Sequence, residues 1–150
     1  MMNRRSRLHV LPLPFLLAST LVVLPAASAW ASPLGVWLAK GETSGRGHIQ
    51  IYKCGAKLCG KLIWSSNPNA KDTKNPNEKL RSRKVVGSDI VWGFVPDGKN
   101  QWDSGRIYDP STGKTYKSIM RLKGGGKLLH VRGYVGISLI GKTRVWSRLR

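Results

Sequence analysis

The sequence of 150 residues has few acidic residues, few histidines and very little cysteine. Seven Asp and Glu stand against 26 Lys and Arg, which gives a formal net charge of +19, and there are two cysteines and three histidines. Only His48 and His130 lie beyond the first 29 residues, which argues against a zinc site with four side-chain ligands. We therefore expect neither a metal ion nor a cofactor.

The motifs of common catalytic centres are also missing. The sequence has no GxSxG elbow, HExxH helix, Walker loop or GxGxxG turn. Glycosidases need two carboxylates across the sugar, but most acidic residues lie in turns, and Asp97 and Asp109 are typical turn formers. Asp103 lies within a strand near Arg106, where an ion pair on the outer face and a catalytic role are both open. We expect no enzymatic activity.

The first 29 residues have the order of a cleaved signal peptide. Three arginines come first, an apolar run over residues 10–24 follows, and small residues end the segment. The apolar run is too short and too interrupted by proline for a membrane span of about 20 residues. We predict a Sec-type signal peptide over 1–29, cleaved after Ala29 or Ala31, and a single domain over 30–150 without a transmembrane span. The protein would then be periplasmic or secreted.

The basic charge indicates anionic partners. Removing the three arginines of the signal leaves 23 Lys and Arg against seven acidic residues, so the mature chain carries formally +16. In an exported protein such charge favours anionic envelope components or a small anionic ligand over nucleic acid. The other interpretation is that the charge is spread over the surface and serves solubility.

The two cysteines lie at the tip of a predicted β-hairpin over residues 46–64. Two alternating runs flank a short glycine-containing loop, with Cys54 and Cys59 at its ends. If these cysteines lie opposite each other, Ile51 lies opposite Leu62 and apolar faces apolar. Export favours a disulfide over reduced thiols or a metal pair. We expect it to make the hairpin tip rigid beside the long loop that follows.

That loop covers residues 65–84 and contains two Asn-Pro pairs. We predict one helical turn over 76–80, with Asn75 as its N-cap. A loop of about twenty residues is uncommon in a compact domain and is often a lid or a binding element. Alternation and turn signals predict the remaining strands near residues 34–40, 90–94, 102–108, 116–122, 129–135 and 142–149.

Together these segments predict an all-β protein of about eight antiparallel strands. Closing into an up-and-down barrel removes the exposed edges, and a β-sandwich is the alternative. Gly35-Val36-Trp37 resembles the G-x-W opening of the lipocalin and avidin superfamily. That resemblance implies that Trp37 packs beneath the barrel beside a basic residue of the last strand, and we expect Arg148 in that role. A barrel of this size is filled by side chains or holds one small ligand.

Several segments resemble an exported bacterial family known as domain of unknown function 2147 (DUF2147). They are CGAKLCGKL, GRIYDPSTGKTY, LHVRGYVG and TRVWSR, together with the Asn-Pro loop. The resemblance implies a small periplasmic or secreted β-rich protein and implies no activity. One departure is Asn77, which stands where the family often has an acidic residue after Asn-Pro.

Aromatic rings and the long loop supply the candidate ligand-binding residues. Ring packing in the core and ordinary solvated charge explain the same residues without a ligand. The candidates are Trp64, Asp72, Asn75, Arg81, Arg83, Trp92, Trp102, Tyr108 and Tyr116. We expect a monomeric, non-catalytic binder of a small amphipathic or anionic ligand or of envelope polyanions. An envelope enzyme acting on glycan or lipid and a basic interaction scaffold are the alternatives.

Overall fold

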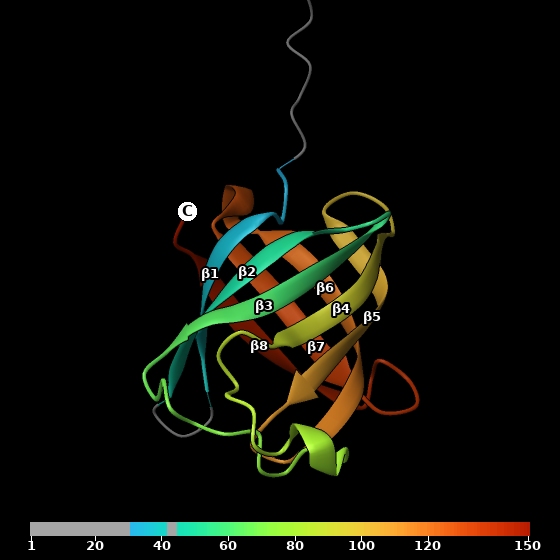
Figure 1. Cartoon of the computed structure of the whole chain (residues 1–150). Coiled ribbons are helices and arrows are strands. Elements are labelled where there is room, and N and C mark those ends of the chain that lie inside the picture. Colours follow the sequence, from blue (N-terminus) through green and yellow to red (C-terminus); the bar gives the residue numbers. More distant parts are fainter. Residues whose placement is uncertain (1–30, 42–44) are drawn as a thin grey trace, which may run out of the picture.

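The computed structural model describes residues 31–41 and 45–150, which form a closed antiparallel barrel of eight strands (Figure 1). The strands are β1 (Gly35–Lys40), β2 (Arg46–Cys54), β3 (Lys57–Ser65), β4 (Asp89–Pro96), β5 (Gln101–Asp109), β6 (Lys114–Lys123), β7 (Leu128–Tyr134) and β8 (Gly141–Arg148). Two single 3₁₀ turns, η1 (Glu78–Leu80) and η2 (Gly124–Gly126), are the helical elements of the described part. The predicted signal peptide lies outside the described residues.

Each strand pairs with its neighbours in sequence, and β1 closes the barrel on β8. Trp37 pairs with Arg148 and Leu38 with Ser147 across this last ladder. Closure leaves both sides of β1 and β8 hydrogen-bonded, which protects the edges that an open sheet would expose. The up-and-down barrel is therefore confirmed over the sandwich. Among the described residues, no helix is long and apolar enough to cross a membrane.

The β2–β3 hairpin contains the predicted Cys54–Cys59 disulfide, with Cα atoms 5.8 Å apart. Its predicted register is wrong by two residues, because Cys54 pairs with Lys57 and Tyr52 with Cys59. The cause is a two-residue turn in which Gly55 has a φ of 67°. A shift of two residues keeps every side chain on its face, so the predicted inner face survives the error.

The connections divide between two ends of the barrel, because successive strands run in opposite directions. The β2–β3, β4–β5 and β6–β7 turns lie with the C-terminus at one end, the upper end in Figure 1. The long β3–β4 loop and the β5–β6 and β7–β8 turns lie at the other end, which we call the mouth. The disulfide and the long loop are thus at opposite ends, and the prediction that they lie side by side is wrong.

The upper end is closed by Trp37 and Arg148. The Trp37 ring is fully buried, and its Nε1 donates to the carbonyl of Pro33 at 2.8 Å. The Arg148 guanidinium lies 4.2 Å from the centre of that ring. Arg148 also donates to the carbonyl oxygens of Ser32, Leu34 and Gly126 at 2.6, 2.8 and 2.7 Å. Arg148 of β8 thus stacks on the ring of Trp37 and hydrogen-bonds to the segment before β1 and to η2.

The interior next to this closed end is filled by side chains. Its fully buried members include Trp37, Phe94, Met120 and Leu129. Glycine makes room for the largest of them, since a Cβ on Gly105 would lie 2.3 Å from the Phe94 ring. Side chains therefore fill the interior in this half of the described barrel.

Candidate functional site

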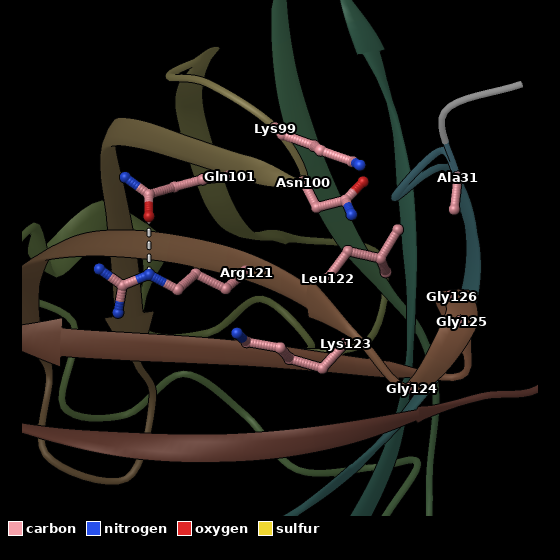
Figure 2. A pocket seen from close by; sticks show the side chains of 10 residues that line it. All are labelled: Ala31, Lys99, Asn100, Gln101, Arg121, Leu122, Lys123, Gly124, Gly125 and Gly126. Atoms are coloured by element: carbon pink, nitrogen blue, oxygen red, sulfur yellow. Dashed lines mark hydrogen bonds between the residues drawn. The ribbon is translucent and has the colours of Figure 1, made fainter. Parts of the chain in front are cut away.

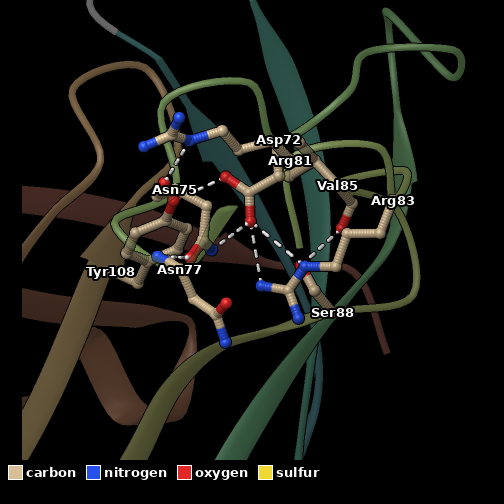
Figure 3. A network of polar contacts seen from close by, with 8 residues as sticks. All are labelled: Asp72, Asn75, Asn77, Arg81, Arg83, Val85, Ser88 and Tyr108. Atoms are coloured by element: carbon tan, nitrogen blue, oxygen red, sulfur yellow. Dashed lines mark hydrogen bonds and ion pairs between the residues drawn. The ribbon is translucent and has the colours of Figure 1, made fainter. Parts of the chain in front are cut away.

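The long loop is held against β5 by the buried carboxylate of Asp72 (Figure 3). Asn75 Nδ2 donates to Asp72 Oδ2 at 2.7 Å, and Arg83 donates to the same oxygen through Nε at 3.1 Å and through a terminal nitrogen at 2.9 Å. The Tyr108 hydroxyl donates to Oδ1. Asp72 and Arg83 are also joined through the backbone, because the Asp72 amide donates to the Arg83 carbonyl at 3.0 Å.

Folding moves the pKa values of Asp72 and Tyr108 in opposite directions, away from neutral pH. Burial raises the pKa of Asp72, but hydrogen bonds from Tyr108, Asn75 and Arg83 and the charge of Arg83 outweigh burial, so the pKa lies below its ordinary value. Burial and the Asp72 carboxylate raise the pKa of Tyr108 to about 12. General acid–base groups have pKa values near the working pH. The cluster therefore suits a fixed structural contact better than proton transfer.

The helical turn of the loop begins later than predicted. The N-cap of η1 is Asn77, whose Oδ1 accepts the Lys79 amide at 3.1 Å. Asn75 cannot cap this turn because its side chain is engaged elsewhere: Oδ1 accepts the Asn77 amide at 2.9 Å and Nδ2 binds Asp72. The Arg81 Nε donates to the Asn75 carbonyl at 2.8 Å. Both loop arginines thus hold the loop itself.

The β5–β6 turn packs against the same loop. Asp109 acts as the predicted turn former, since its carboxylate accepts the Ser111 amide and hydroxyl at 2.9 and 2.6 Å. Gly113 has a φ of 72°, and a Cβ there would lie 1.9 Å from the Lys74 carbonyl oxygen. The loop and the turn are therefore in direct contact.

A hollow of about 640 Å³ opens at the mouth. Its apolar lining includes Ile107, Val131 and Tyr116, and Lys142 and Arg144 of β8 supply positive charge. Gly133 of β7 faces the same space, and a Cβ there would lie 3.2 Å from Ile107 Cγ2. The open side is lined by residues of the β7–β8 turn. The lining thus combines apolar side chains with the cations Lys142 and Arg144 and the carboxylate of Asp109.

A second hollow lies at the closed end and has a different lining (Figure 2). It measures about 450 Å³ and is lined by Lys99, Arg121 and Lys123 with η2 beside them. Arg121 donates to Gln101 Oε1 at 2.7 Å (Figure 2). Few apolar side chains line it, so it offers surface cations without an apolar chamber.

The structure brings most of the predicted binding residues together. The Asp72 cluster contains Asp72, Asn75, Arg81, Arg83 and Tyr108 (Figure 3). Trp92 lies beside it in a small hollow of about 320 Å³, and Tyr116 lines the mouth hollow. Lys142 and Arg144 were absent from the candidates. The signal for them was the inward parity that Arg144 shares with Trp146 and Arg148.

Two predicted tryptophans lie away from these hollows. Trp64 is 43% exposed, and its ring lies 4.5 Å from that of His48. Strict alternation predicts Trp64 on the inner face with Leu62. A bulge in the β2–β3 ladder beside His48 shifts the register, so the two side chains lie on opposite faces. Trp102 pairs with Met120 and Pro96 toward the closed end.

Among the described residues, Asp103 does not form the ion pair with Arg106 that its sequence context left open. Its Oδ1 accepts the amide of Ser104, a residue with a φ of 62° at a bulge of β5. Arg106 donates to the Gly105 carbonyl at 3.1 Å. Asp103 therefore stabilises the bulge through the backbone.

The closed eight-stranded barrel, with the G-x-W motif on β1 and Arg148 packed on its tryptophan at the closed end, has a lipocalin-like fold. It is similar to a solved structure described as protein HP1028 from the human pathogen Helicobacter pylori, which belongs to the lipocalin family. The two chains are 23% identical, the match covers 80% of this chain and 84% of the other, and the TM-score is 0.73.

A family model described as "Uncharacterized protein conserved in bacteria (DUF2147)" matches residues 35–148. The chain belongs to this family, as the segments quoted above indicate. A search of curated proteins finds no significant match.

Proposed function

We propose that this protein is an exported, non-catalytic binder that holds a small amphipathic anion in the mouth hollow. The observation that carries the proposal is the combination of an apolar chamber of about 640 Å³ with Lys142 and Arg144 in its lining. Ligand pockets measure about 300–1,000 Å³ and combine an apolar lining with a few polar groups. An acyl chain against Ile107 and Val131, with its carboxylate near the two cations, satisfies both features.

Displacement of a fluorescent fatty acid from the mature protein tests the proposal. We expect saturable binding of one probe per chain and competition by an unlabelled fatty acid. Gly133→Leu would fill the chamber and weaken binding at least about 10-fold, since the leucine occupies space that the acyl chain needs. Arg144→Glu should also weaken binding, whereas the matched charge reversal Lys123→Glu at the closed end should not.

The result that overturns the proposal is binding that is absent, or unchanged in a folded Gly133→Leu variant. Thermal unfolding of each variant establishes that it is folded. Native mass spectrometry of protein purified from the periplasm adds the natural occupant, which we expect to be an anion with an alkyl or acyl portion.

A second candidate function is the binding of envelope polyanions to the outer surface. The observation in its favour is the cluster of Lys99, Arg121 and Lys123 at the closed end. Contacts between exposed charges weaken over a Debye length of about 8 Å at physiological ionic strength. Binding that disappears in high salt and is lost with Lys123→Glu would favour this function over the chamber.

A further inference from the structure

The β7–β8 turn exposes more apolar surface than any other turn of the described barrel. Val135, Ile137, Leu139 and Ile140 are between 58% and 83% exposed. We call residues 135–140 the apolar loop. Single exposed apolar residues are ordinary on a protein surface, but four within six residues mark an interaction site.

The exposed side chains belong to an ordered turn. The Ile140 amide donates to the Ile137 carbonyl at 3.1 Å, and the Val135 amide donates to the Ile140 carbonyl at the same distance. Arg132 of β7 donates to the carbonyls of Ser138 and Leu139 at 2.6 and 3.0 Å. The backbone polar groups are thus occupied at the strand side, and the apolar side chains are presented to solvent.

Lysines flank this loop. Lys142 follows the loop directly, and Lys117 pairs with Tyr134 on the strand before it. An apolar tip flanked by lysines matches the interface of an anionic bilayer, where apolar side chains enter the acyl boundary and cations contact phosphates.

We propose that the apolar loop docks the protein on an anionic phospholipid bilayer by inserting Ile137 and Leu139 into its interface. A second copy of the chain fits this surface less well, because pairing two loops would bring two sets of cations together. Docking goes beyond the proposed function, since it requires no ligand in the chamber. Val135 and Ile140 also line the mouth hollow, so a docked barrel has its opening at the membrane.

Flotation with vesicles of phosphatidylglycerol and phosphatidylethanolamine tests this proposal in the mature protein. We expect binding to these vesicles and at least about 10-fold weaker binding to vesicles of phosphatidylcholine alone, because the cations lose their partners. The double variant Ile137→Asp and Leu139→Asp should weaken binding roughly 10- to 100-fold. Both side chains are exposed, so the fold should be unchanged. Val145→Asp is the matched control, since Val145 is 48% exposed on the barrel wall.

A labelled cysteine measures insertion directly. Both native cysteines form the disulfide, so Leu139→Cys provides a single thiol for an environment-sensitive dye. We expect its emission to rise and shift to the blue on anionic vesicles, while the same dye at Val145→Cys stays unchanged. Equal binding of the double variant and the wild type would overturn the proposal. So would sedimentation showing that the loop variants abolish a dimer and leave vesicle binding intact.

Failure of docking and failure of ligand binding can be told apart. Gly133→Leu should lose the fatty-acid probe and keep vesicle binding, whereas the loop variant should do the reverse.

Discussion

The two ends of this barrel are formed by the same eight strands but differ in how their inward side chains fill the interior. Along the inward positions of β7, Leu129 is fully buried near the closed end, whereas Val131 and Gly133 line the hollow at the mouth. Along β8, Trp146 is buried, while Arg144 lines the hollow. Bulky apolar side chains thus give way to glycine and cations. Space for a ligand is created by changing a few inward residues while the hydrogen-bonded wall continues unchanged.

The comparison also explains why stability and binding should separate. The closed end contributes buried aromatic contacts around Trp37, whereas the mouth depends on the polar contacts of Asp72. Variants of the closed end should lower stability and leave ligand affinity unchanged. Variants of the mouth should affect both, because Tyr108 belongs to the Asp72 cluster and lines the hollow.

The largest effect is expected for Trp37→Ala. Removing this fully buried ring should lower the free energy of unfolding by about 3–5 kcal/mol. Urea unfolding measures the loss, and probe affinity in the remaining folded protein should be within twofold of the wild type. Trp64→Ala is the matched control, with an expected loss under about 1 kcal/mol because Trp64 is partly exposed. Equal losses in the two variants would contradict the role of Trp37.

Asp72→Asn should have the next largest effect. The substitution removes the carboxylate that pairs with Arg83 at 2.9 Å, and we expect a loss of about 2–3 kcal/mol at pH 7. Because folding lowers the pKa of Asp72, its contribution is present above the unfolded pKa of about 4 and is lost as the pH falls through the folded pKa. Wild-type stability should therefore fall more steeply than that of the variant below pH 4.

Unfolding curves collected between pH 2 and pH 7 measure this difference. Probe affinity should also decrease in Asp72→Asn, because Tyr108 donates a hydrogen bond to Asp72 and lines the hollow. An unchanged affinity would show that this hydrogen bond does not position Tyr108 for binding.

The smallest effect is expected for the double variant Cys54→Ser and Cys59→Ser. The disulfide closes a short loop, so its removal should cost about 2 kcal/mol. Since the hairpin tip lies at the closed end, probe affinity should not change. Thermal unfolding with and without reductant measures the loss, which the serine variant should make insensitive to reductant. A change in affinity would mean that the two ends are coupled.

Local pattern predicted the strands well because it depends on neighbours in the chain. Alternation placed Ile49 and Ile51 on the inner face, and that result held even though the hairpin register is two residues away from the predicted one. The outward position of Trp64 was not predictable in this way. A bulge changes parity, and its position depends on the strand that pairs across it.

The sequence predicted which residues belong to the candidate site but not how they contact one another. The loop residues Asp72, Asn75 and Arg83 were candidates for a ligand, and the structure shows them bound to one another and to Tyr108. The sequence of a polar residue and its neighbours does not show whether its hydrogen-bond partner is a ligand or another part of the chain. Their hydrogen bonds span up to 36 positions of sequence, beyond the reach of local pattern.

By itself, the sequence determined the strand order, the disulfide partners, the family and the basic charge, because alternation, turn residues and composition are properties of neighbouring positions. The tertiary structure decided which end of the barrel is filled and which is hollow. That outcome depends on side chains from different strands meeting across the interior, as Phe94 does over Gly105 and Ile107 beside Gly133. The interior volume that remains free depends on these contacts between strands, so it is defined only once the barrel has closed.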